Sequence, residues 1–85
     1  SFVQERRSIG AAELPFEFMM NALRLNRGFP RRLFTERTGL PFEAAEEGLL
    51  KARRQGLIEV DGETLRPSAR GRHFLNELLM LFLAA

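Results

Sequence analysis

The sequence contains no cysteine, tryptophan or tyrosine, and His73 is its only histidine. Without cysteine, the chain can contribute no disulfide, thiol nucleophile or iron–sulfur ligand. A single histidine cannot supply the ligand spacing of a zinc site. No glycine-rich phosphate loop is present, because the glycines fall at expected turns and helix ends. We therefore predict that these residues include no catalytic residue, no cofactor-binding residue and no metal ligand.

The sequence also has no long hydrophobic run and no large excess of charge. Its longest apolar run, "LLMLFLAA", is far shorter than the roughly 20 residues that cross a bilayer. No signal peptide is visible, so we expect a cytoplasmic protein without a membrane span. The net charge is only +2, and every basic residue except Lys51 is an arginine.

The length of the chain suits one small domain. Residues 1–12 carry charge and a glycine without clear periodicity, so we interpret them as a lead-in or linker from a larger parent protein. The domain then covers residues 13–85. Hydrophobic periodicity, with prolines and glycines at the ends, predicts helices over residues 14–26, 31–37, 42–55 and 69–83. Gly39 and Gly56 are expected to turn the chain, and Ser68 is expected to cap the last helix.

The segment "LIEVDGETLRP" predicts a β-hairpin. Asp61 and Gly62 form a pair that favours a two-residue type I′ turn. With that turn Ile58 lies opposite Leu65 on the buried face, and Glu59 lies opposite Thr64 on the solvent face. The predicted fold class is therefore mainly α with a small β-hairpin. It is winged-helix-like, with four helices plus a two-stranded wing.

DNA binding is the function first suggested by such a fold, and the charges argue against it. The third helix would enter the major groove, and its outward side carries Glu43, Glu46 and Glu47 near the start. The tip of the wing is acidic as well, whereas DNA affinity depends on neutralising phosphates. We therefore expect no useful nucleic-acid binding, although Arg31, Arg32, Arg53 and Arg54 could supply some positive surface.

Haem ligation by His73 or by a methionine is a second possibility. A lone histidine near the start of an amphipathic helix is more often a surface or boundary residue. Met19, Met20 and Met80 lie in apolar surroundings and are expected to pack against other side chains.

The first and last helices carry more apolar residues than one core face needs. In "ELPFEFMMNALRL" only Glu17, Asn21 and Arg24 form a polar strip, and in the last helix several apolar residues fall outside its main apolar face. Contiguous apolar patches on small domains usually mark interaction sites. The predicted interdomain docking residues are Phe16, Met20, Leu23, Leu79, Met80 and Leu83, with Phe18 and Leu25 as the alternative on the first helix. We expect the isolated domain to dimerise through them, and Leu79→Gln and Leu83→Gln to leave the fold intact.

Four stretches, "ELPFEFMMNALRL", "FTERTGLP", "ARRQGLIE" and "LRPSARGRHFLNELLMLFL", carry a family resemblance. The sequence resembles the C-terminal domain of HemW-like radical SAM proteins, which are related to oxygen-independent coproporphyrinogen III oxidase. The resemblance covers residues 13–83 and implies a parent protein in porphyrin or haem metabolism. That parent would have a preceding barrel that holds a [4Fe–4S] cluster and S-adenosylmethionine through a CxxxCxxC motif, and it could also bind haem.

The CxxxCxxC motif is absent from this sequence, so none of the residues that hold these cofactors can be assigned here. The implied partner of the domain is the barrel of its own parent chain. The first stretch points to the HemW side of the family, whose members are proposed to be haem chaperones rather than true oxidases. The alternatives are a free-standing winged-helix DNA-binding domain and a structural oligomerisation domain.

Overall fold

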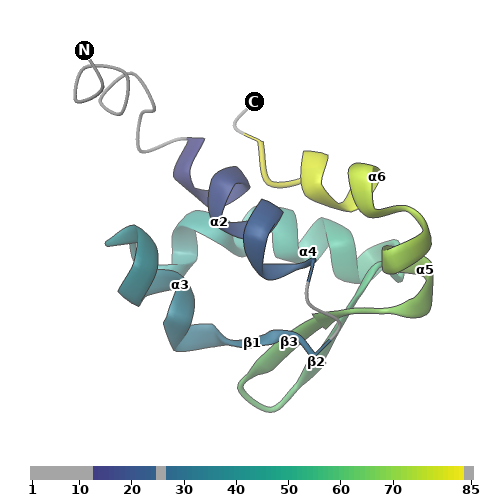
Figure 1. Ribbon diagram of the computed structural model, residues 1–85, viewed down its shortest axis with the longest axis horizontal. Helices are drawn as coiled ribbons and strands as arrows, with labels where there is room; N and C mark the ends of the chain where they lie inside the picture. Colours follow the sequence, from purple (N-terminus) through teal and green to yellow (C-terminus); the bar gives the residue numbers. More distant parts are fainter. Residues whose placement is uncertain (1–12, 25–26, 84–85) are drawn as a thin grey trace.

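The computed structural model describes residues 13–24 and 27–83. The predicted lead-in, residues 1–12, lies outside this described part. Figure 1 shows helices α2 and α6 side by side on one side of the molecule, and the β-hairpin at the opposite side. The elements in chain order are α2 (Leu14–Ala22), β1 (Phe29–Pro30), α3 (Arg31–Thr38), the 3₁₀ helix η2 (Phe42–Ala45), α4 (Glu46–Arg54), β2 (Ile58–Asp61), β3 (Thr64–Pro67), α5 (Ala69–His73) and α6 (Leu75–Met80). The prediction of a mainly helical domain with a small hairpin is confirmed.

Helix α3 and the turn after it follow the predicted pattern. Pro30 precedes the helix in an extended conformation, and Gly39 ends it with a φ of 76°. The Thr38 hydroxyl donates to the Phe34 carbonyl oxygen at 2.7 Å and accepts the Leu40 N–H at 3.0 Å. These bonds close the tight turn that the sequence predicts.

The predicted helix over residues 42–55 begins as a 3₁₀ turn. Only from Glu46 does it become the α-helix α4, because Ala45 has φ −105° and ψ 0°. Its predicted inner face is confirmed: Ala45, Leu49 and Ala52 are buried, and Phe42 is half-buried. Gly56 stops the helix with a φ of 72°, as expected.

The sheet has three antiparallel strands in the order β1-β3-β2, so the predicted two-stranded wing is incomplete. Strand β1 pairs Phe29 with Leu65 and Pro30 with Thr64, and the Arg31 N–H donates to the Glu63 carbonyl oxygen at 2.7 Å. The sequence analysis interpreted this segment only as a break between helices. A strand of two residues shows no alternation of side chains, so periodicity could not reveal it.

The predicted end of the first helix at Asn26 also needs correction, because α2 ends at Ala22. The Leu23 N–H still donates to the Met19 carbonyl oxygen at 2.9 Å, and Asn26 lies outside the described residues. Gly28 then passes so close to β3 that a side chain there would overlap the Leu65 carbonyl oxygen. The chain thus leaves α2 well before the position predicted and then meets the sheet at Gly28.

The predicted register of the hairpin is wrong by two residues. Asp61 pairs with Thr64 and Val60 with Leu65, so the turn residues are Gly62 and Glu63 rather than Asp61 and Gly62. Gly62 has a φ of 62°, and among the described residues only glycines have positive φ. Positive φ at the first turn residue alone is the pattern of a type II′ turn. The shift by two keeps Ile58 and Leu65 on the buried face.

The turn makes a testable prediction. Gly62→Val should lower the free energy of unfolding by about 1 kcal/mol or more, because a β-branched residue is strained at positive φ. A side chain at this position would meet no atom within 4 Å, so the cost comes from the backbone alone. Gly62→Asn should cost less, since asparagine tolerates this region. Equal urea midpoints for Gly62→Val and wild type would contradict the turn assignment.

The predicted last helix is broken in two. Ser68 caps its start as expected, with its hydroxyl accepting the Gly71 N–H at 3.0 Å. Phe74, at φ −111° and ψ 49°, then separates α5 from α6. Helix α5 rests on the base of the hairpin through Gly71, whereas α6 packs beside α2. One straight helix does not make both contacts, so the chain bends between them.

A single hydrophobic core joins all of these elements except α5. Phe34 is fully buried, and Phe18 and Phe42 meet its ring edge-on at centroid distances of 5.3 and 5.8 Å. The core residues are Met19, Ala22, Leu23, Phe29, Phe34, Ala45, Leu49, Ala52, Leu57, Ile58, Leu65, Leu78, Leu79 and Phe82.

Candidate interaction surface

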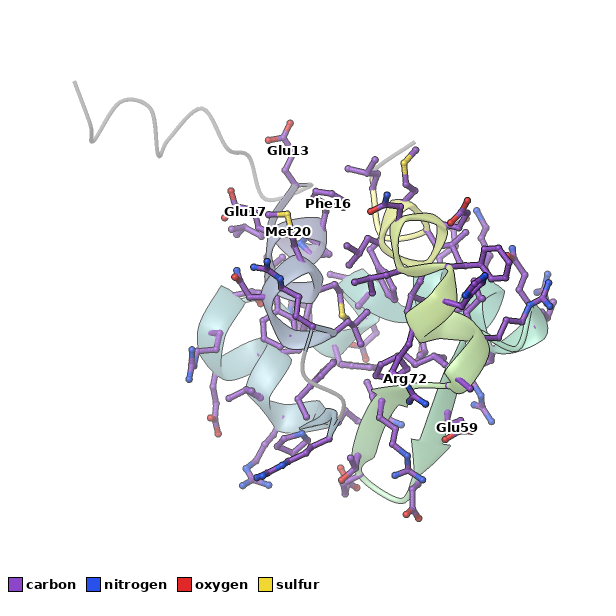
Figure 2. The ribbon with its side chains drawn as sticks, turned by 45° about the vertical axis from the view of Figure 1, so that its right-hand side comes forward. Glu13, Phe16, Glu17, Met20, Glu59 and Arg72 are labelled. Atoms are coloured by element: carbon purple, nitrogen blue, oxygen red, sulfur yellow. The ribbon has the colours of Figure 1, made fainter. Side chains whose placement is uncertain are left out.

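Three of the five exposed large hydrophobic residues in the described part of the chain lie on or just after the neighbouring helices α2 and α6. Met20 is 39% exposed on α2, and Met80 and Leu83 are 60% and 43% exposed on and just after α6. Phe16 is half-buried one turn before Met20, and Figure 2 shows it on the side of α2 toward α6. We refer to Phe16, Met20, Met80 and Leu83 as the α2–α6 surface.

Two of the predicted docking residues belong to the core instead. Leu23 is 1% exposed and Leu79 is 8% exposed, so neither side chain is available to a partner. Leu79 is buried with Leu78 and Phe82 on the inner side of α6, whereas Met80 points outward. The expectation that Leu79→Gln leaves the fold intact is therefore withdrawn.

The alternative face of the first helix is partly used inside the domain. Phe18 is half-buried, and its ring meets Phe29 and Phe34 edge-on at 5.0 and 5.3 Å. Leu25, the other residue of that alternative, lies outside the described residues. The packing of Phe18 thus favours the side with Phe16 and Met20 as the exposed side of α2.

A shallow hollow adjoins the α2–α6 surface. It lies between the end of α4 and helix α6, and it is lined by Gln55, Asn76, Glu77, Met80 and Leu81. Because Met80 borders this hollow and is the most exposed of the large apolar residues, a partner that covers α6 could fill it with a side chain.

Nothing in the described part of the chain resembles an enclosed catalytic centre. No polar or charged side chain among residues 13–24 and 27–83 is buried. Over the same ranges, no group of three or more His, Asp or Glu side chains is placed to hold a metal ion. His73 is exposed, and its ring contacts Phe74 edge-on at 4.6 Å. Met19 is in the core, while Met20 and Met80 are exposed rather than packed as expected.

The acidic residues lie where the sequence analysis places them. Glu43, Glu46 and Glu47 are exposed at the start of η2 and α4, and Asp61, Gly62 and Glu63 are exposed at the tip of the hairpin. An approaching phosphate backbone would meet these carboxylates first. No helix in the described part of the chain is long and apolar enough to span a membrane.

Comparison with known proteins shows similarity to one family and to relatives that share one description. The model of the family "HemN C-terminal domain" matches residues 10–74. The chain is 34% identical over 82 residues to "Heme chaperone HemW" of Haemophilus influenzae. This match covers 96% of this chain and 21% of that protein. It is 36% identical over 83 residues to the Escherichia coli protein of the same description, and this match covers 98% of this chain and 22% of that protein. No solved structure matches. The chain thus spans about a fifth of the length of these relatives.

Proposed function

Because this chain belongs to the HemN C-terminal domain family, we propose that it serves as the non-catalytic domain of a longer radical SAM protein and packs against the catalytic barrel of that protein. The observation that carries the proposal is the exposed α2–α6 surface on a chain that spans about a fifth of its relatives. Burying a side chain of this size contributes roughly 1.5–3 kcal/mol. The four residues of the α2–α6 surface are already partly covered within the domain, so each would contribute a part of that amount on docking.

The role of the longer protein is part of the same proposal. Relatives described as heme chaperones favour haem delivery over the oxidation of coproporphyrinogen. The [4Fe–4S] cluster and S-adenosylmethionine of such a protein would be bound outside this chain, because the chain has no cysteine. The domain would work in the cytoplasm, and its winged-helix-like arrangement would act as a docking module.

The principal alternative is a free-standing winged-helix DNA-binding domain. The exposed carboxylates of Glu43, Glu46 and Glu47 disfavour it, because they occupy the end of the helix that would meet base edges. The similarity to much longer relatives, at 34% and 36% identity over nearly the whole chain, also favours a domain of a larger protein.

Limited proteolysis of the full-length parent tests the docking proposal. Met80→Gln with Leu83→Gln should weaken the contact and speed cleavage between barrel and domain several-fold. In the isolated domain the same pair should change the free energy of unfolding by no more than about 0.5 kcal/mol for each residue, because Met80 and Leu83 are 60% and 43% exposed on the surface.

Leu50→Gln is the matched control, because Leu50 is 49% exposed but lies on the outer side of α4. It should leave the cleavage rate of the parent unchanged. Cleavage of the Met80→Gln, Leu83→Gln parent at the wild-type rate would show that the α2–α6 surface does not hold the domain.

A further inference from the structure

The outer face of α4 carries opposite charges at its two ends, on either side of one exposed leucine. Glu46 and Glu47 lie in the first turn, Arg53 and Arg54 in the last, and Leu50 between them is 49% exposed. At 100° per residue, Glu46 and Arg53 fall on one flank of Leu50, and Glu47 and Arg54 fall on the other. We refer to these five residues as the α4 face.

The charges of the α4 face are largely free of partners within the domain. Among the described residues, Glu46, Arg53 and Arg54 make no ion pair. Glu47 approaches Lys51 at 3.6 Å, but both side chains are at least half exposed, so the pair is weak. The helix dipole favours acids at the start and bases at the end. It does not account for the exposed leucine midway between them.

We propose that the α4 face binds the α4 face of a second copy of this chain, with the two helices antiparallel across a two-fold axis at Leu50. Such an axis reverses the helix direction but keeps each flank on its own side. Glu46 therefore meets Arg53 of the second copy, and Glu47 meets Arg54 of the second copy. Each contact occurs twice, and the two Leu50 side chains touch. A patch that complements itself in this way is what a two-fold dimer requires.

The α4 face is independent of the α2–α6 surface. Ala45, Leu49 and Ala52 form the buried side of the helix, and Gly48 packs against Leu81 and Phe82 beside α6. The α4 face points away from these contacts, so a longer chain docked on α2 and α6 leaves it accessible. The pairing therefore does not depend on the proposed function.

The expected association is weak and sensitive to salt. One short helix per copy buries much less than the roughly 800 Å² per partner of a stable interface. Exposed ion pairs supply most of the attraction, and they are screened as ionic strength rises. Association through the apolar α2–α6 surface would not weaken with salt, so the two modes can be separated.

Sedimentation equilibrium at low salt, with two charge-reversed variants, tests the proposal. One variant carries Arg53→Glu and Arg54→Glu, and the other carries Glu46→Arg and Glu47→Arg. Each alone should self-associate at least about tenfold more weakly than wild type, because like charges meet across the axis. A one-to-one mixture should form a heterodimer at least as tight as the wild-type dimer, because acids then face bases at every contact.

Control variants guard against effects of net charge and of folding. Arg32→Glu with Arg37→Glu, and Glu36→Arg with Glu77→Arg, shift the net charge as much as the test variants do but lie outside α4. Neither should change self-association, and their one-to-one mixture should not tighten it. Leu50→Gln should weaken it without reversing any charge, and circular dichroism should show every variant folded. A wild-type chain that stays monomeric at millimolar concentration, or a mixture that does not associate, overturns the proposal.

Discussion

Gly71→Ala is expected to lower the free energy of unfolding by about 3 kcal/mol or more, although alanine is the better helix former. Gly71 lies in α5 directly against the backbone of Leu57, and a methyl group there would overlap the Leu57 carbonyl oxygen. That oxygen also accepts the Ser68 N–H at 3.0 Å. Leu57 is buried between α4 and β2, so its backbone has little room to move. Relief would require α5 to leave the hairpin.

Gly39→Ala is the comparison variant, because it adds backbone strain without a steric clash. Gly39 has a φ of 76°, and a side chain there would meet no atom within 4 Å. The change should therefore cost only about 1 kcal/mol, from strain at positive φ. Urea unfolding followed by circular dichroism measures both variants. A Gly71→Ala protein as stable as wild type would show that α5 does not contact Leu57 in this way.

Leu79→Gln should lower the free energy of unfolding by about 3 kcal/mol or more. The leucine is 8% exposed in the core, and its loss removes roughly 1.5–3 kcal/mol of apolar burial. The glutamine amide would in addition be buried without a hydrogen-bond partner, at a cost of about 1–3 kcal/mol.

Met80→Gln is the matched comparison for Leu79→Gln. The two residues are adjacent on α6, but Met80 is 60% exposed, so its replacement should change stability by no more than about 0.5 kcal/mol. Chemical denaturation of the two single variants compares them directly. Similar losses for both would mean that the inner and outer sides of α6 have been assigned wrongly.

Features that depend on local chemistry could be predicted from the sequence. The positive φ of Gly39, Gly56 and Gly62 and the cap by Ser68 each follow from one residue type in its immediate neighbourhood. The inner face of α4 follows from periodicity, because that helix has a single apolar side.

Features that depend on distant contacts could not be predicted. Strand β1 exists because residues 29–30 meet β3, and the break at Phe74 arises because α5 and α6 pack on different elements. The same holds for the α2–α6 surface. Leu79 and Met80 are both apolar and adjacent in sequence, and only the packing of α6 shows which of them is exposed.

The order of the strands also bears on how the domain avoids aggregation. Strand β3 lies in the centre of the sheet, so β1 and β2 are its two edges. Both edges are poor templates for a further strand. At one edge β1 has two residues, and Pro30 has no N–H to offer a neighbouring chain. At the other edge β2 carries the carboxylates of Glu59 and Asp61, both next to Arg66. Short, charged or proline-containing edges are those that natural proteins use against strand addition. Growth of fibrils by strand addition is therefore disfavoured at both edges of this sheet.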